Sequence, residues 1–154
     1  MSWPMARAII MLPGTALVFV PAAILWASAG SASAAAPTSY RDWEFWLALL
    51  LLLPGLALAA WTMRLFLTLG EGTPAPWDPP RKLVVRGPYR HVRNPMITGV
   101  LAMLLAQAVV LRSWPLALWR ALFFLANYFR LSEEKGLERR FGRDYRIYKA
   151  PVPR

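Results

Sequence analysis

The segment RGPYRHVRNPMITG, residues 86–99, concentrates side chains that can hold an anion. Its glycine and proline predict a turn, and Asn94 and Pro95 predict the N-cap and the first residue of a helix. Unpaired N–H groups and the helix dipole favour a carboxylate or phosphate there, and guanidinium groups bind either one bidentately. The side chains that carry or can gain positive charge before the helix are Arg90, His91 and Arg93. The alternative is a basic loop that touches only lipid phosphate.

A second polar segment, residues 131–154, begins with two adjacent acids at the end of an apolar run. Acids at that position face a large excess of cations, so they need a partner. If the preceding helix continues, Asn127, Arg130 and Glu134 share one face, and Arg130 can pair with Glu134. The alternative is that Ser132 caps a new helix, with Glu133 and Glu134 complementing its dipole.

The rest of that segment predicts an amphipathic helix. Apolar and aromatic side chains recur there at helical spacing, at Leu137, Phe141, Tyr145 and Tyr148. Cations surround them, at Arg139, Arg140, Arg143 and Arg146.

Four apolar segments have to position these motifs, at residues 8–27, 43–69, 95–111 and 115–131. About 20 apolar residues in a helix cross a hydrocarbon core of about 30 Å. A loop at 70–94, rich in Pro and Gly, and a tail at 132–154 complete a single domain of residues 1–154. We therefore expect an all-α polytopic membrane protein with about four transmembrane helices and a cytoplasmic amphipathic C-terminal helix.

The first apolar segment also has features of a cleavable signal peptide. Arg7 precedes it, and small residues at 31–36 resemble a cleavage site. The run is longer than the 7 to 15 residues of a typical signal core and contains Pro13 and Pro21, so we expect it to be retained.

The distribution of positive charge predicts the orientation. The loop at 70–94 holds five Lys or Arg and the tail from residue 130 holds eight, whereas the two opposite connections hold only Arg41 and Arg112. Positive residues favour the cytoplasmic side. The chain is thus expected in the inner (cytoplasmic) membrane, with both termini and the polar motifs facing the cytoplasm.

Composition argues against several classes of function. The net charge of +10, from 18 Lys and Arg and 8 Asp and Glu, is first a signal for topology and for anionic lipid headgroups. No nucleic-acid-binding signature is present, so nucleic acid is not an expected partner. The chain has no cysteine and a single histidine, His91, so we expect no disulfide and no metal site.

Taken together, the two motifs resemble the isoprenylcysteine carboxyl methyltransferase family, which is related to membrane phospholipid N-methyltransferases. The resemblance rests on RGPYRHVRNPMITG followed, one helical hairpin later, by EEKGLERRFGRDYRIYKAPVPR, and it covers about residues 79–154. The chain departs from the family's Arg-His-Pro-x-Tyr-x-Gly at two positions, where Asn94 replaces a histidine and Ile97 a tyrosine.

The resemblance implies an S-adenosyl-L-methionine-dependent methyltransferase that acts on a membrane lipid or a lipidated acceptor, at either a carboxylate or an amine. For such a reaction we predict Arg130 and Glu134 as the catalytic residues, because either can orient the acceptor and Glu134 can take up a proton from an amine. The resemblance implies cofactor contacts from the Arg93-x-Pro95 segment and from the Glu133–Glu134 pair. With the neighbouring residues, the predicted cofactor-binding residues are Tyr89, Arg90, His91, Arg93, Asn94, Pro95, Gly99, Glu133 and Glu134. The residue chemistry agrees, because cations and a helix start suit the cofactor's carboxylate, and acids suit its ammonium and ribose hydroxyls.

Two other classes of function stay open. A polybasic membrane protein would bind anionic lipid without catalysis, and its behaviour would depend on charge rather than on residue identity. A small transporter usually needs an ionisable residue deep in a span. Arg120, in the fourth segment, is either such a residue or a side chain that snorkels outward.

Overall fold

The computed structural model describes residues 10–31, 34–73, 79–128 and 131–153, with the backbone alone at 10–13, 128 and 131–135. In these residues the regular structure is entirely helical, which agrees with the predicted all-α class. A π-helix η1 (Ile10–Phe19) continues into α2 (Val20–Ser28), and α3 (Trp43–Thr68) follows. A short 3₁₀ turn η2 (Gly87–Arg90) precedes α4 (Pro95–Val110), α5 (Trp114–Tyr128) and α6 (Leu131–Lys149).

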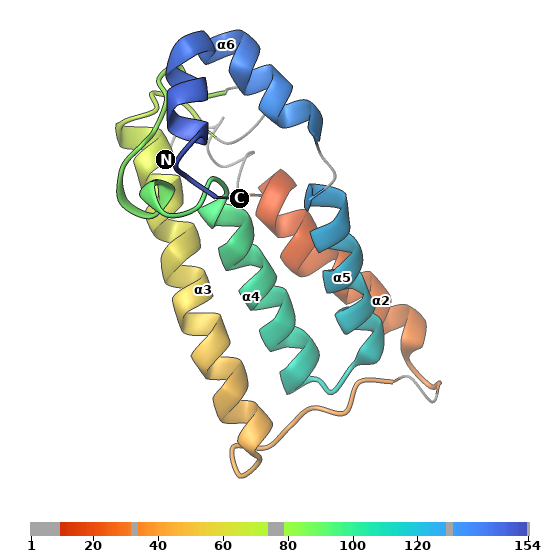
Figure 1. Cartoon of the computed structure of the whole chain (residues 1–154). Coiled ribbons are helices and arrows are strands. Elements are labelled where there is room, and N and C mark those ends of the chain that lie inside the picture. The colour runs from red at the N-terminus through yellow and green to blue at the C-terminus, as the bar shows by residue number, and fades with distance from the viewer. Residues whose placement is uncertain (1–9, 32–33, 74–78, 129–130, 154) are drawn as a thin grey trace.

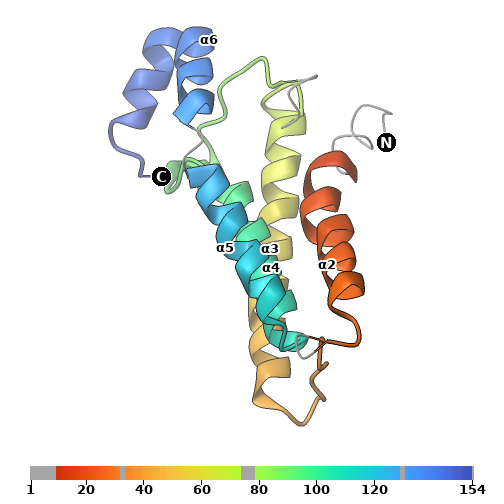
Figure 2. The same cartoon turned by 90° about the vertical axis from the view of Figure 1, so that its right-hand side faces the viewer.

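Helices α2 to α5 lie side by side as a bundle, and α6 lies across one end of it (Figures 1 and 2). The C-terminal end of α3, the turn η2 and the start of α4 lie at the same end as α6. The connections from α2 to α3 and from α4 to α5 lie at the opposite end. The topology thus brings the two polar segments to one end of the bundle.

Helix α3 is the one described helix that is long and apolar enough to cross a membrane. Only 17% of its most apolar 18-residue window is buried inside the fold, so most of this helix faces outward, unlike the core helix of a soluble protein. Helices α4 and α5, with 16 and 15 residues, are shorter than the roughly 20 residues of a perpendicular span. The four-span topology therefore stays a prediction.

Two glycines allow α3 and α4 to approach closely. A Cβ added to Gly99 would lie 2.7 Å from the carbonyl oxygen of Gly55, and one added to Gly55 would lie 2.9 Å from the carbonyl oxygen of Gly99. Any side chain at either position would force the helices apart. Gly99, which the resemblance assigns to the cofactor, thus has a packing role between helices.

The first apolar segment is tied into the bundle by two side chains. Gln107 Nε2 donates to the carbonyl of Leu17 at 2.8 Å, and Trp119 Nε1 donates to the carbonyl of Ala16 at 3.1 Å. Pro21 lies four and five residues after these positions and has no N–H to donate to either carbonyl. The proline that interrupts this helix is therefore matched by donors from α4 and α5. That the first apolar segment is retained and not cleaved stays a prediction, but the segment has a structural role.

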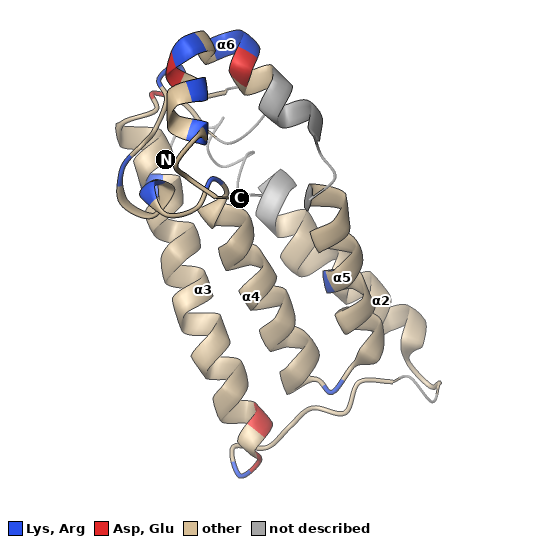
Figure 3. Ribbon diagram, viewed as in Figure 1, with Lys and Arg blue, Asp and Glu red and all other residues tan. Residues whose placement is uncertain are grey.

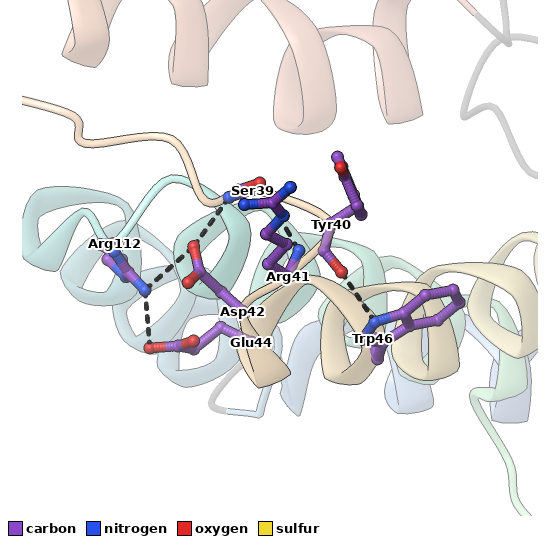
Figure 4. Close-up of polar contacts among 7 residues, drawn as sticks. All are labelled: Ser39, Tyr40, Arg41, Asp42, Glu44, Trp46 and Arg112. Atoms are coloured by element: carbon purple, nitrogen blue, oxygen red, sulfur yellow. Dashed lines mark hydrogen bonds and ion pairs between the residues drawn. The ribbon is translucent and has the colours of Figure 1, made fainter.

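The end opposite α6 is closed by a small ion-pair network, the Arg112 clasp (Figure 4). The Arg112 guanidinium lies 3.1 Å from Glu44 and 3.4 Å from Asp42, which joins the α4–α5 turn to the start of α3. Backbone N–H groups of Ala36 and Thr38 donate to the carbonyls of Leu111 and Val110, at 2.9 and 2.8 Å. The clasp and these bonds complete the helix ends there.

Candidate functional site

The loop that carries the first motif is fixed to the end of α3. The carbonyl of Gly70 accepts N–H groups from Arg81 at 2.7 Å and from Lys82 at 3.1 Å. Further along, Gly87 has φ +59°, and a Cβ there would lie 3.1 Å from the indole of Trp61 and 3.2 Å from Leu65. Both the backbone angle and the close contact require glycine at the turn that opens the motif.

Tyr89 anchors the motif against α3. Its ring is 6% exposed and meets Phe66 edge to face, with ring centroids 5.5 Å apart. Burial raises the pKa of the Tyr89 hydroxyl well above its usual value, and the neighbouring Tyr148 adds to this effect. Tyr89 therefore stays protonated and positions the backbone of the residues that follow it.

Two hydrogen bonds join the first motif to the C-terminal segment. The Tyr148 hydroxyl donates to the carbonyl of Tyr89 at 2.7 Å, and the N–H of Arg93 donates to the carbonyl of Pro153 at 2.9 Å. Tyr145, Tyr148 and Val152 form a buried apolar cluster beneath these contacts. Segments about sixty residues apart thus form one structural unit.

The apolar face predicted for the tail packs on the protein itself. Leu137 and Phe141 pack against the cluster of Tyr145, Tyr148 and Val152, and so does Leu83 from the loop. The spacing of these side chains is therefore confirmed as an amphipathic face. The surrounding cations, Arg139, Arg140, Arg143 and Arg146, are exposed, and Figure 3 shows the basic positions along α6.

The tail differs in two ways from a straight helix that continues α5, which was one of the two alternatives. Helix α6 bends at Gly142, where φ is 52° and ψ is −120°. The bend brings Lys149 Nζ to 3.0 Å from Glu138 Oε1, although eleven residues of straight helix span about 16 Å. The helix is also not a continuation of α5, which ends at Tyr128, because α6 turns across the end of the bundle to reach the loop.

The remaining predicted site residues differ in how far they are exposed. Arg90 and His91 are exposed, and Arg93 is half-buried beside Tyr148. Pro95 is fully buried at the start of α4. Asn94 occupies the predicted N-cap position but makes no side-chain capping bond, because its φ of −128° and ψ of 59° differ from the usual cap geometry. Arg130 and the side chains of Glu133 and Glu134 lie outside the described residues, as does the side chain of Tyr128.

Sequence reasoning overlooked an open groove of about 570 Å³ beside the motif. Its charged lining residues are Arg81 and Lys82 from the loop and Asp144 from α6. The side chains between them are apolar or aromatic: Leu83, Val85, Phe141, Ile147 and Tyr148. Tyr148 also bonds Tyr89, so the groove borders the first motif. Neither segment alone signals the groove, because its walls come from both.

The titration of Tyr148 reflects the same environment. Burial raises its pKa to about 12, Tyr145 contributes in the same direction, and the positive charge of Arg93 acts in the opposite direction. The hydroxyl is therefore a proton donor over the whole physiological range.

These features define a helical membrane protein whose polar residues gather at one basic end, built from two distant segments. The chain belongs to the phospholipid methyltransferase family, PEMT, whose family model matches residues 43–144. The match covers about two thirds of the 154-residue chain, including the first motif and the first part of the second. Membership indicates a membrane-associated methyltransferase that acts on lipids. No curated protein and no solved structure matches the chain.

Proposed function

We propose that the protein transfers a methyl group from S-adenosyl-L-methionine to the amine of a membrane phospholipid, at the end of the bundle where η2, α4 and α6 meet. The main support is that Tyr148 and Arg93 tie together the two motifs that a methyltransferase of this kind needs, within a chain whose family is defined by phospholipid methylation. The amine, rather than a carboxylate, is the acceptor that the family name favours.

The residues of the first motif fit the cofactor's carboxylate. Arg90 and His91 are exposed at the approach to α4, and Arg93 is held by its backbone bond to Pro153. The helix start at Pro95 adds the favourable end of a helix dipole. Tyr89 supports this surface from below, and Asn94 places it at the head of α4. We assign Gly99 no cofactor contact, since its close approach to Gly55 of α3 already explains why glycine occupies this position.

The acids of the second motif complete the proposed site. The backbone of Glu133 and Glu134 lies in the first turn of α6, at the same end of the bundle as the first motif. Carboxylates there suit the cofactor's ammonium and its ribose hydroxyls. When bound, the cofactor supplies a methyl group on a positively charged sulfur. A protonated lipid amine must lose a proton before its nitrogen can attack, and Glu134 takes that proton while Arg130 orients the headgroup.

Alignment accounts for most of the catalysis in this proposal. Methyl transfer needs no covalent residue, and orienting two reactants can supply roughly 7 to 11 kcal/mol of the barrier. The open groove beside Tyr148 fits this requirement, because it offers charged walls and apolar side chains to an amphiphilic acceptor. The purely lipid-anchoring alternative is less well supported, since the side chains of the apolar face of α6 pack on one another, on Val152 and on Leu83 of the loop.

The methylated product tests this function directly. The full-length protein would be reconstituted into vesicles of phosphatidylethanolamine, phosphatidylglycerol and phosphatidylcholine and incubated with methyl-labelled cofactor. We expect label in a methylated phosphatidylethanolamine, strongly reduced in Glu134→Gln and retained in Arg143→Ala, which removes an exposed cation of the same helix. Label that alkali releases as methanol would show an ester instead of an amine product. No labelled lipid would refute the function.

A further inference from the structure

Arg120 is a charged residue on the inward face of α5. It lies four residues after Leu116, which is 1% exposed, and three before Phe123, which packs on the central core. The opposite face of the helix, with Leu118, Leu122 and Leu125, is 45 to 50% exposed. Arg120 itself is half-buried, and its Nε is buried with no hydrogen-bond partner among the described residues.

The helices of the bundle supply no counter-charge for this guanidinium. Glu44, in the first turn of α3, is the only acidic residue in η1 or in helices α2 to α5. Its Oε1 already lies 3.1 Å from Arg112. A charged side chain within the apolar layer is costly unless it meets a counter-ion or water. These helices therefore offer Arg120 no free carboxylate, and an anion that neutralises it would come from outside the bundle.

The position of Arg120 limits where that anion can lie. Arg120 lies six positions after Trp114, which is 63% exposed, so it lies about 9 Å along the helix from that end. Side chains of a helix lean toward its N-terminus, so the guanidinium leans toward Trp114. This brings it within reach of lipid phosphates in the leaflet at that end.

A second buried polar atom lies in α4, which packs against α5. Gln107 Oε1 is buried without a hydrogen-bond partner, while its Nε2 donates to Leu17. Trp119, the residue before Arg120, donates to the carbonyl of Ala16, which directly precedes Leu17 in η1. Thus Gln107 Oε1 in α4 is an acceptor and Arg120 Nε in α5 a donor without a partner among the described residues, and both residues are next to or part of the contacts that hold the first segment.

We propose that Arg120 binds the phosphate of an acidic phospholipid, seated against η1, α2 and α5 in the leaflet at the Trp114 end. The lipid's negative charge neutralises the guanidinium, and a headgroup with hydroxyl groups also offers donors to Gln107. This lipid is distinct from the methyl acceptor, which is placed at the opposite end of the bundle. It is a structural ligand that secures the first segment.

Thermal unfolding of the full-length protein in mixed micelles tests the proposal. We expect phosphatidylglycerol to raise the midpoint temperature by about 4 °C or more, because a ligand that binds only the folded state stabilises it, and phosphatidylcholine to raise it much less. Arg120→Met should abolish the shift. Arg64→Met, which removes an exposed arginine from α3, should keep it.

Three results would overturn the proposal: an equal shift with phosphatidylcholine, a phosphatidylglycerol shift that survives in Arg120→Met, or equal loss in both variants. If Arg120→Met does not fold, mass spectrometry of the wild-type protein released from micelles gives a second measurement. One retained phosphatidylglycerol per chain is expected at a phosphatidylglycerol to phosphatidylcholine ratio of one. Random retention of the two lipids shows that Arg120 only reaches bulk headgroups, which also contradicts the proposal.

Discussion

The two ends of the bundle use charge in different ways. At the end closed by the Arg112 clasp, the two cations Arg41 and Arg112 are equal in number to the two acids Asp42 and Glu44, both of which contact Arg112 (Figure 4). At the end covered by α6, the loop at 70–94 and the tail from residue 130 hold thirteen cations and six acids (Figure 3). Charges that balance locally stabilise a fold, whereas a surplus leaves cations available for an anionic ligand. The comparison therefore separates a structural end from a ligand-binding end.

Membrane orientation gives the most clear-cut test of this difference, because the result is all or none. The chain has no native cysteine, so single cysteines at the exposed positions Arg90 and Ser39 mark the two ends. We expect an impermeant thiol reagent applied to intact cells to label Ser39→Cys and not Arg90→Cys. The reverse pattern would place the cation-rich end outside the cell and contradict the proposed cytoplasmic site.

Removing the Tyr148 hydroxyl should weaken the ligand-binding end. In Tyr148→Phe the buried carbonyl of Tyr89 loses a 2.7 Å hydrogen bond, which costs about 1 to 3 kcal/mol of unfolding free energy. Cofactor binding should fall as well, because the two motifs are no longer fixed together. Denaturant unfolding and titration measure the two effects. Tyr40→Phe, at an exposed tyrosine of the opposite end, is the matched control and should change neither.

Removing the clasp should have a smaller effect, confined to stability. Arg112→Gln breaks the contacts to Asp42 and Glu44, and exposed ion pairs each contribute about 0.2 to 1 kcal/mol. Unfolding experiments should show a loss of that size that shrinks at high salt, with unchanged cofactor affinity. A marked loss of affinity in Arg112→Gln would show that the two ends are coupled.

The smallest expected effect appears only at alkaline pH. An unfolded tyrosine ionises near pH 10, whereas burial holds the pKa of Tyr148 at about 12 in the folded protein. Its contribution to stability is thus complete below pH 10 and is lost as the pH rises to 12. The stability difference between wild type and Tyr148→Phe should shrink over this window. A difference independent of pH would contradict the burial of the hydroxyl.

Local patterns in the sequence predicted the elements better than their contacts. The apolar runs predicted α3, α4 and α5 to within a few residues, because composition and proline positions define such helices. Helical spacing identified the apolar face of the tail, but it did not predict that Leu83 of the loop packs against that face. Spacing within a helix says which side chains share a face and nothing about what they meet.

Two glycines show the same limit. Gly142 lies in a segment that reads as one amphipathic helix, and its bend follows from a positive φ and a fold-back that no local pattern requires. Gly99 fits the resemblance to a cofactor motif, yet its contact with Gly55 depends on how two helices cross. For the site, charge and order in the chain predicted that the motifs share one end. The bonds of Tyr148 and Pro153 became visible only in three dimensions.

The claim that the two motifs form a single cofactor site is tested most directly by a double-mutant cycle. Calorimetric titration of S-adenosyl-L-methionine would compare wild type, Arg93→Lys, Glu134→Gln and the double variant, with Arg143→Ala as control. Each single change should cost about 1.5 to 3 kcal/mol, the range of a hydrogen bond to a charged group, and Arg93→Lys loses the planar fork while keeping its charge. We expect the double variant to lose at least 0.5 kcal/mol less than the sum, with the control unchanged. Strictly additive losses, or a wild-type protein that binds no cofactor at millimolar concentration, would contradict a shared site.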